Sequence, residues 1–371
     1  MEKFDVLIIG AGVVGLACAR EISNEGLSVV VAEKNSSFGE ETSSRNSEII
    51  HAGLYYKPGS LKAKLCIEGR RRLVELCREH GIPFKLTGKI IVSITEAETG
   101  QLEALKRNAE ECGADTLTML TGKEVAAMEP AVTASSGLLS PGTGIIDTHS
   151  LMAFFLRSAE ENGAIVVFDS PVEEITPEDG LYRIALGDRD ATRFASRVVV
   201  NAAGLNADGV AEMAGIDTDK HGYRLHLAKG EYFRVGGKSP VSRLIYPVPK
   251  SGGGHLGIHT VIDLAGSLKL GPNEYYVTEI EYSVNPDNLA PTYDSVRKFI
   301  PGLEISGLSP DMSGIRPRLY LKGEEVRDFV ICDERDKGLP GFINLIGIES
   351  PGLTAAPAIA RHVSSLVKPY L

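Results

Sequence analysis

The sequence predicts a mixed α/β fold, in which an antiparallel β-sheet domain is inserted into a domain built on a parallel sheet. Three observations lead to this prediction. An apolar run at residues 4–9 is followed by closely spaced glycines and then by helical apolar spacing. A second buried-strand pattern, at 197–204, also turns at a glycine and returns the chain to the first sheet. From 223 to about 282 the apolar period falls to two, which is typical of antiparallel sheet.

The N-terminal segment has the pattern of a dinucleotide-binding βαβ unit. Gly10 permits the tight turn after the strand, Gly12 lets the backbone approach a pyrophosphate, and Gly15 allows the helix to pack closely on the strand. The expected helix over 13–25 would direct its first N–H groups toward the phosphates. Gly26 is the expected end of this helix.

Glu33 indicates which dinucleotide is bound. It follows the second apolar run, 28–32, at about the 20-residue offset where an acidic residue accepts hydrogen bonds from a ribose. A carboxylate at this place disfavours a ribose 2′-phosphate, so FAD or NAD is favoured over NADP. The motif precedes a long chain with no catalytic domain before it, which is the usual layout of FAD enzymes. FAD is therefore the expected cofactor.

Length and composition are those of an ordinary globular protein. The 371 residues, 43% hydrophobic and 24% charged, are enough for about two domains. The net charge of −10 argues against nucleic acid as a main partner. Five scattered cysteines without metal-ligand spacing predict neither a disulfide framework nor a metal site. No segment approaches the roughly 18 apolar residues of a membrane span. We therefore expect a cytoplasmic protein without a metal.

The other elements are predicted from apolar spacing in chain order. Further helices are expected at 58–80, 96–112, 151–162 and 353–367. Further strands are expected at 90–94, 164–168, 172–175 and 342–347. A segment rich in small polar residues, 40–47, is expected to form a loop over the cofactor, and 140–144 is expected to form a turn.

Six motifs occur together along nearly the whole chain. They are Gly10–Gly15, Ser44–Tyr56, Asn201–Gly204, Lys229–Tyr232, Gly314–Pro317 and Gly347–Thr354. This set resembles the D-amino-acid-oxidase-like FAD oxidoreductases. Within them the sequence is most similar to the L-2-hydroxyglutarate dehydrogenase/oxidase family, chiefly through the stretch from His51 to Ala63.

The resemblance implies a Rossmann-like FAD-binding domain of the glutathione-reductase type, with an inserted antiparallel β-sheet that binds the substrate. The FAD-binding domain is expected to be discontinuous, and the division of the chain is as follows. The FAD-binding domain takes residues 1–88, 141–222 and 305–371, and the substrate-binding domain takes 89–140 and 223–304.

The resemblance also names the residues that would contact FAD. They are Gly10, Gly12, Val14, Gly15, Glu33, Lys34, Ser43, Ser44, Arg45, Asn46, Val172, Ala203, Gly204, Gly314, Gly352, Leu353 and Thr354. In relatives the strand at Val172 contacts the adenine, and the turn at Gly204 approaches the cofactor. The helix that starts at Gly352 could face the N1–C2=O edge of the flavin and stabilise its reduced form.

Oxidation of a 2-hydroxy acid requires a base for the hydroxyl proton, and histidine suits this role because it is mostly neutral near pH 7. Two of the eight histidines are candidates. His51 lies in the loop that the resemblance brings over the flavin, and His259 lies in a strand of the expected substrate sheet. A structural role is an alternative for both. Since some relatives tether FAD through a histidine, His51 is also the candidate for covalent attachment.

Arg316 is the best candidate for binding the substrate carboxylate, because a guanidinium offers a planar pair of donors. In amine-oxidising relatives the arginine of the matching motif holds the α-carboxylate. A surface ion pair is the structural alternative. The second carboxylate of a dicarboxylic acid would need another donor, and the candidates are Lys229, Tyr246 and Tyr55.

The sequence thus predicts FAD-dependent oxidation of L-2-hydroxyglutarate, or a close 2-hydroxy acid, by hydride transfer from Cα to flavin N5. The electrons would pass to a quinone, to oxygen or to another acceptor, and a quinone would bring the protein to the inner membrane face as a peripheral protein. An FAD-dependent amine oxidase acting on glycine, sarcosine or a D-amino acid is the alternative. A non-catalytic flavin-binding subunit is the second alternative.

Overall fold

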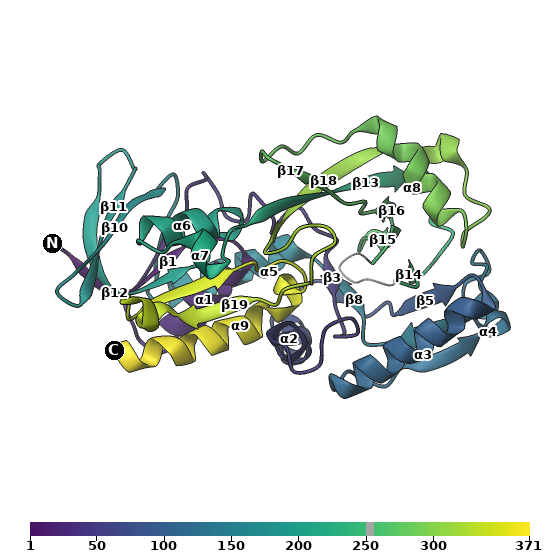
Figure 1. Cartoon of the computed structure of the whole chain (residues 1–371), viewed down its shortest axis with the longest axis horizontal. Coiled ribbons are helices and arrows are strands. Elements are labelled where there is room, and N and C mark those ends of the chain that lie inside the picture. Colours follow the sequence, from purple (N-terminus) through teal and green to yellow (C-terminus); the bar gives the residue numbers. More distant parts are fainter. Residues whose placement is uncertain (250–255) are drawn as a thin grey trace.

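The computed structural model describes residues 1–249 and 256–371. Figure 1 shows two parts side by side: a large sheet with its helices on the left, and smaller sheets with helices α3, α4 and α8 on the right. Both termini lie on the side of the large sheet. Each part contains strands from the early, middle and late sequence, so the chain crosses between the two parts several times.

The large sheet has eight strands, ordered β10-β11-β12-β1-β2-β9, with β20 beside β12 and β19 beside β20. The strands are β1 (Lys3–Ile9), β2 (Val29–Ala32), β9 (Ile165–Val167), β10 (Val172–Glu178), β11 (Leu181–Leu186), β12 (Arg193–Asn201), β19 (Val330–Asp333) and β20 (Phe342–Ile346). β1 is parallel to both neighbours, so that Ile8 pairs with Val200 and Val31. The glycine turn therefore follows a central strand at its carboxyl end.

Both faces of the large sheet are buried. Alternation along β1 sends Val6 and Ile8 into one hydrophobic core, and Leu7 and Ile9 into a second. The first core lies against four helices: α1 (Val13–Ser23), α2 (Leu61–His80), α5 (Thr148–Glu161) and α9 (Gly352–Val367). The opposite face carries two short helices, α6 (Ala207–Met213) and α7 (Thr218–His221).

Helices α2 and α9 cross closely because of one glycine. A Cβ on Gly69 of α2 would lie 2.5 Å from the backbone oxygen of Thr354 and 2.6 Å from Cα of Ala355, both on α9. α2 is capped at its start by Ser60, whose hydroxyl accepts a hydrogen bond from the Ala63 backbone N–H, and at its end by Gly81, which has a φ of +67°. This crossing fixes the start of α9.

The second part contains two sheets and a small three-stranded sheet. The five-stranded sheet consists of β13 (His226–Val235), β15 (His259–Ile262), β16 (Leu268–Gly271), β17 (Tyr275–Val277) and β18 (Leu308–Arg318). The four-stranded sheet consists of β5 (Lys89–Ser93), β6 (Thr118–Thr121), β7 (Ser136–Ser140) and β14 (Leu244–Pro247). The small sheet consists of β3 (Ile49–Ile50), β4 (Phe84–Lys85) and β8 (Gly144–Ile146). The helices of this part are α3 (Glu96–Glu111), α4 (Gly122–Met128) and α8 (Leu289–Val296).

The helices predicted from apolar spacing are confirmed, with ends that differ by a few residues. The expectation of one inserted antiparallel sheet is wrong in one respect. Strands from the stretch 223–282 are divided between two sheets, and β14 pairs in parallel with β5. Alternation predicts a strand but carries no information about its partner. Residues 250–255 of that stretch lie outside the described residues.

None of the helices in the described ranges is long and apolar enough to cross a membrane.

Candidate active site

A cavity of about 620 Å³, called here the central cavity, lies between the large sheet and the smaller sheets. Its walls come from the glycine turn after β1, the loop 39–56, strands β13 and β18, and the start of α9. Residues expected to bind the cofactor and residues expected to bind the substrate both line it. The cavity is therefore the place where the two sets could act together.

The glycine turn is shaped by close backbone contacts. Gly10 has a φ of +103°, and a Cβ there would lie 2.7 Å from the backbone oxygen of Ala202. A Cβ on Gly15 would lie 2.0 Å from the backbone oxygen of Gly10. Gly12 lines the cavity directly at the start of α1. The turn thus places bare backbone and a helix N-terminus at the cavity wall, which suits a pyrophosphate.

Glu33 lies at the end of β2 and is 6% exposed. Its carboxylate accepts hydrogen bonds from the backbone N–H groups of Ala11, at 2.7 Å, and Asn35, at 2.9 Å. These two bonds fix a carboxylate on the cavity wall, where a ribose could reach it. Lys34 and Val172 line the cavity as well. Contact of these residues with the adenosine end of the cofactor stays a prediction.

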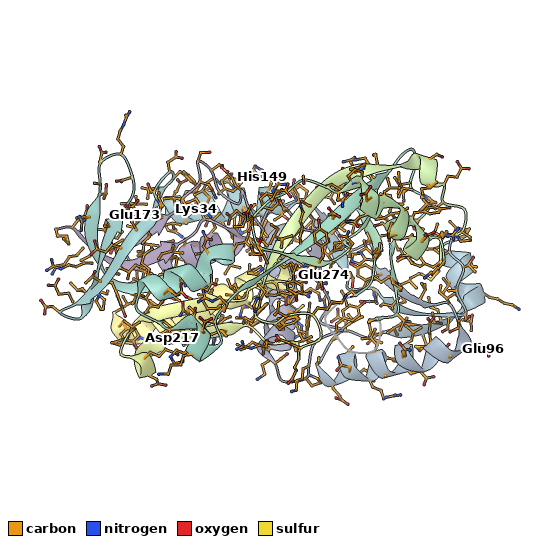
Figure 2. All side chains as sticks on the ribbon, turned by 45° about the horizontal axis from the view of Figure 1, so that its top comes forward. Lys34, Glu96, His149, Glu173, Asp217 and Glu274 are labelled. Carbon is orange, nitrogen blue, oxygen red and sulfur yellow. The ribbon has the colours of Figure 1, made fainter. Side chains whose placement is uncertain are left out.

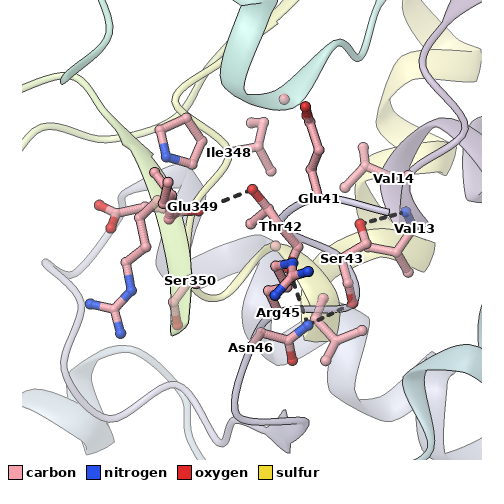
Figure 3. Close-up of a pocket in the computed structure, with 18 of the residues that line it drawn as sticks. Val13, Val14, Glu41, Thr42, Ser43, Arg45, Asn46, Ile348, Glu349 and Ser350 are labelled. Atoms are coloured by element: carbon pink, nitrogen blue, oxygen red, sulfur yellow. Dashed lines mark hydrogen bonds between the residues drawn. The ribbon is translucent and has the colours of Figure 1, made fainter. Parts of the chain in front are cut away.

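The loop after residue 40 is fixed between α1 and β18 (Figure 3). The Ser43 hydroxyl accepts a hydrogen bond from the Val13 backbone N–H at 3.0 Å, and Thr42 donates to the backbone oxygen of Ile315 at 3.0 Å. A Cβ on Gly314 would lie 2.0 Å from the backbone oxygen of Arg45. This close approach explains why a glycine stands there.

Most of the loop residues expected at the cofactor line the cavity. Ser43, Arg45 and Asn46 line it, and Asn46 donates to the Ser43 backbone oxygen at 2.7 Å. Ser44 does not line it and donates to the Gly39 backbone oxygen instead. Ala203, Gly204, Gly314, Gly352, Leu353 and Val14 also belong to the lining. Thr354 and Gly15 lie outside the lining. Thr354 accepts a hydrogen bond from the backbone of His51, and Gly15 packs against the backbone of Gly10, and both of these partners line the cavity.

The start of α9 and the loop at His51 are joined by hydrogen bonds. The fully buried Thr354 hydroxyl accepts a bond from the His51 backbone N–H at 3.0 Å and donates to the Ile49 backbone oxygen at 3.1 Å. His51 Nε2 lies 3.2 Å from the Ser350 hydroxyl. Burial lowers the pKa of His51 to about 3, and the charges of Lys89 and Arg316 add to the effect. The imidazole is therefore neutral in the free protein.

A network of charged side chains forms another wall of the cavity. Arg316 donates to Glu274 at 3.2 Å, and Arg318 donates to the same carboxylate at 2.7 Å. Arg318 also bonds to Glu349 at 3.1 Å, and Lys62 bonds to Glu349 at 2.9 Å. Burial opposes ionisation of Glu349, but Lys62 and Arg318 outweigh it and lower the pKa of this carboxyl. Figure 2 shows Glu274 in the middle of the molecule.

The two arginines differ in accessibility. The Arg318 side chain is 4% exposed, whereas that of Arg316 is 29% exposed. Sequence reasoning identified Arg316 and missed Arg318, although alternation along a strand places residues two apart on one face. Glu274 lies in a loop remote from the other members in sequence, and no local signal could identify it as their partner.

Aromatic rings form the wall on the side of the four-stranded sheet. Tyr246 and His259 stack with ring centroids 3.7 Å apart, and both line the cavity. The Lys89 ammonium lies 4.5 Å from the ring centroid of Tyr55 and 4.6 Å from that of Tyr246. Sequence reasoning missed Lys89, because a lysine in a strand pattern usually faces solvent.

Lys229 was expected at the second carboxylate, but the structure does not place it in the cavity lining. Its ammonium bonds to Glu281 at 2.7 Å. The next residue of β13, Gly230, lines the cavity. Since side chains alternate across a strand, Lys229 points to the opposite face.

Gly15 gives a direct test of cofactor binding. We expect Gly15→Ala to lose most of its flavin, to below about a tenth of the wild-type content, because a close-packed turn cannot absorb a Cβ placed against backbone. The ratio of flavin to protein absorbance after purification measures this. Gly100→Ala in α3 is the matched control, because nothing lies within 4 Å of its Cβ position. Equal flavin content in both variants would contradict the expectation.

Comparisons with known proteins agree with this geometry. The model of the FAD dependent oxidoreductase family matches residues 5–366. The mitochondrial L-2-hydroxyglutarate dehydrogenase of Arabidopsis thaliana is 38% identical, over 98% of this chain and 83% of that protein. The glycerol 3-phosphate dehydrogenase of Caloramator mitchellensis is 33% identical, over 98% of this chain and 74% of that protein.

Two solved structures show the same mixed α/β fold. L-alpha-glycerophosphate oxidase from Mycoplasma pneumoniae, solved with FAD bound, superposes with a TM-score of 0.88 at 28% identity, covering 99% of this chain and 95% of that one. Glycine oxidase from Geobacillus kaustophilus superposes with a TM-score of 0.83 at 21% identity, covering 100% of this chain and 96% of that one. At that lower identity the likeness concerns the fold alone.

The comparisons also correct one expectation. The L-2-hydroxyglutarate dehydrogenases that match this chain, those of Arabidopsis thaliana and Homo sapiens among them, are named as mitochondrial proteins. This finding contradicts the predicted cytoplasmic location. Composition could not have revealed it, because the charge and cysteine content of the chain do not distinguish these compartments.

The family model covers nearly the whole chain, and its cofactor agrees with the glycine turn, the buried Glu33 and the cavity between them. The chain belongs to the family of FAD-dependent oxidoreductases.

Proposed function

We propose that this enzyme oxidises L-2-hydroxyglutarate to 2-oxoglutarate. The observation that carries the proposal is the position of His51 in the central cavity, which Arg316 also lines. Burial lowers the pKa of the His51 imidazole, and the charges of Lys89 and Arg316 add to that effect. A 2-hydroxy dicarboxylic acid needs a base for its hydroxyl and positive charge for each carboxylate. The names of the relatives at 30–38% identity support the same substrate.

FAD, when bound, accepts the hydride that leaves Cα of the substrate. Gly12 and the start of α1 would hold its pyrophosphate, and Glu33 would hold a ribose. We infer that the large sheet and its helices form the Rossmann-like part of the glutathione-reductase type, over about the ranges expected from the sequence. β18 differs in that it pairs with β13 of the five-stranded sheet.

His51 is the proposed base, and Nε2 would take the hydroxyl proton. The His51 backbone N–H donates to Thr354 and holds the residue at the cavity wall, and the substrate hydroxyl would replace the Ser350 hydroxyl as the partner of Nε2. A base is most effective when its pKa is near the working pH, and burial, with the charges of Lys89 and Arg316, keeps the pKa of His51 far below that value in the free protein. A bound dianion would offset the charges of Arg316 and Lys89, and it would thereby raise the pKa of His51 where the base is needed.

Arg316 is the proposed ligand of the α-carboxylate. Its bond to Glu274 uses Nη1, and the side chain is 29% exposed at the cavity, so other N–H groups of the fork can meet a carboxylate. Glu274 also bonds to Arg318, which is anchored to Glu349. This buried chain of ion pairs holds Arg316 in one orientation before substrate arrives.

Glycerol 3-phosphate is the second candidate substrate, because a relative of 33% identity and a solved structure of 28% identity carry that substrate in their names. It shares a secondary hydroxyl and a net charge of about −2 with L-2-hydroxyglutarate, but both of its charges lie on one phosphate group. Amine oxidation is the alternative from the sequence, and the two glycine oxidase structures that match this chain, at 21% and 18% identity, share the fold alone. The electron acceptor, whether a quinone or oxygen, stays a prediction.

Anaerobic flavin absorbance tests the proposal. L-2-hydroxyglutarate, its D-enantiomer, glycerol 3-phosphate, glycine and sarcosine are each added to the purified protein while the oxidised-flavin band is followed. We expect rapid bleaching with L-2-hydroxyglutarate and little with the others. Bleaching by glycerol 3-phosphate alone would favour the second candidate, and bleaching by an amine would overturn the hydroxy-acid proposal. A flavin that no compound reduces would support a non-catalytic subunit.

A further inference from the structure

Lys89 is a buried amine without an ordinary partner, and burial lowers the pKa of its ammonium group to about 7. The side chain is 0% exposed, and within residues 1–249 and 256–371 its ammonium has no hydrogen-bond acceptor and no carboxylate in ion-pair contact. Burying an unpaired charge is costly, and the faces of two tyrosine rings offset only part of that cost. An anion bound beside these rings would favour the charged form of Lys89 and offset part of this cost.

The aromatic rings around Lys89 belong to the wall of the central cavity. β5 places Lys89 on the same face as Ile91, which packs in one core with Tyr246. Tyr246 and Tyr55, the two rings that enclose the ammonium, both line the cavity. The Tyr55 hydroxyl is itself buried without a hydrogen-bond partner in the described part of the chain. A hydroxyl donor and an amine that ionises near neutral pH therefore lie together at one wall, and neither has a hydrogen-bond partner among the described residues.

A second observation places the charge within reach of the reacting centre. His51 and Arg316 line the same cavity as Tyr55 and Tyr246, the two rings that contact Lys89. The charges of Lys89 and Arg316 add to the effect of burial in lowering the pKa of His51. Arg316 comes from β18 in the five-stranded sheet and Lys89 from β5 in the four-stranded sheet. Two cations from two sheets can thus attract two negative groups of one small molecule.

We propose that Lys89, with the Tyr55 hydroxyl, is the specificity-determining element that selects a substrate with a second negative group, a carboxylate or a phosphate, beyond the one that Arg316 binds. The inference rests on the proposed function and names the part of the site that distinguishes a dianion from a monoanion. Lys89 acts from behind the tyrosine rings by electrostatic attraction, so it is a positioning residue rather than a catalytic one.

Binding of unreactive acids tests this inference without turnover. Glutarate has two carboxylates and no hydroxyl, whereas butyrate has one carboxylate, and each can be titrated against the flavin absorbance of the holoenzyme. In the wild-type protein we expect glutarate to bind about tenfold or more tightly than butyrate. Lys89→Met should weaken glutarate binding by about 10- to 100-fold and butyrate binding by less than about threefold. Lys269→Met, in β16, is the matched control, because Lys269 bonds to Asp311 and does not line the cavity.

Each outcome decides the inference. Selective loss of glutarate binding in Lys89→Met, with an unfolding temperature equal to or above that of the wild type, would support it. Equal loss for glutarate and butyrate would overturn it, as would equal affinity of the wild-type protein for the two acids, a measurement that needs no variant. If the wild-type flavin binds glutarate selectively but is not reduced by L-2-hydroxyglutarate, the proposed function fails while the assignment of Lys89 to a dianion site stands.

Discussion

Replacing His51 by asparagine is expected to slow the anaerobic reduction of the flavin by L-2-hydroxyglutarate by about 10²- to 10⁴-fold. Asparagine keeps a polar group toward the Ser350 hydroxyl but cannot take a proton. The backbone bond from His51 to Thr354 does not depend on the side chain, so flavin content should be unchanged. Stopped-flow absorbance under argon measures the rate, and substrate titration separates a loss in rate from a loss in affinity.

Two further variants make this result specific. His149→Asn is the matched control, because His149 stacks on Phe38 and does not line the central cavity. His259→Asn tests the other candidate, whose ring stacks on Tyr246. Slow reduction in His259→Asn together with a normal rate in His51→Asn would transfer the role of base to His259.

The pH dependence of the same enzyme follows from the lowered pKa of His51. With a pKa of about 3 in the free protein, the imidazole is neutral at every pH above about 5, so kcat/KM should show no fall near pH 6.5 as the pH is lowered from 8 to 5. An ordinary histidine would lose its basic form through that range. A limb near pH 6.5 that disappears in His51→Asn would contradict the lowered pKa.

The cofactor half of the site could be predicted from the sequence because its determinants are local. Gly10, Gly12 and Gly15 lie within six residues, and their spacing alone identifies the turn. The closest contact of a Cβ on Gly15 would be with Gly10 of the same turn, and that of a Cβ on Gly10 would be with Ala202, just after the neighbouring strand β12. Glu33 follows on the neighbouring parallel strand, at a spacing that the βαβ connection sets. Patterns of this kind are complete within one short segment, so no knowledge of distant pairing was needed.

The substrate half depends on pairings that local patterns do not contain. Lys89 faces Tyr55 and Tyr246, which come from a loop and from a strand more than 150 residues away. Lys229 was a suitable type of residue for binding a carboxylate, but its side chain lies on the face of β13 away from the cavity and bonds to Glu281. For both lysines the sequence gives the residue type. It does not give the face of the sheet that the side chain occupies, because that face depends on how the strands pair.

Arg316 and Arg318 lie on the same strand and bond to the same carboxylate, that of Glu274. We expect replacement of Arg316 to lower kcat/KM and replacement of Arg318 to lower the free energy of unfolding. Arg316→Met removes the accessible fork, which should lower kcat/KM for L-2-hydroxyglutarate by about 30- to 5,000-fold, the range for truncating one partner of a buried charge pair. Its stability should change little, because Glu274 keeps its bond to Arg318. Steady-state kinetics and thermal unfolding of the same preparation measure both quantities.

Arg318→Met is the contrasting variant, since the Arg318 side chain is 4% exposed and joins two carboxylates, Glu274 and Glu349. Its loss leaves both with fewer partners in a buried network, which should cost about 3–5 kcal/mol of unfolding free energy. If Arg316→Met instead destabilised the protein as much as Arg318→Met and left kcat/KM intact, Arg316 would be a structural ion pair. The two arginines carry the same charge and differ in exposure. The comparison therefore distinguishes an arginine that binds the substrate carboxylate, Arg316, from an arginine that stabilises the buried ion-pair network, Arg318.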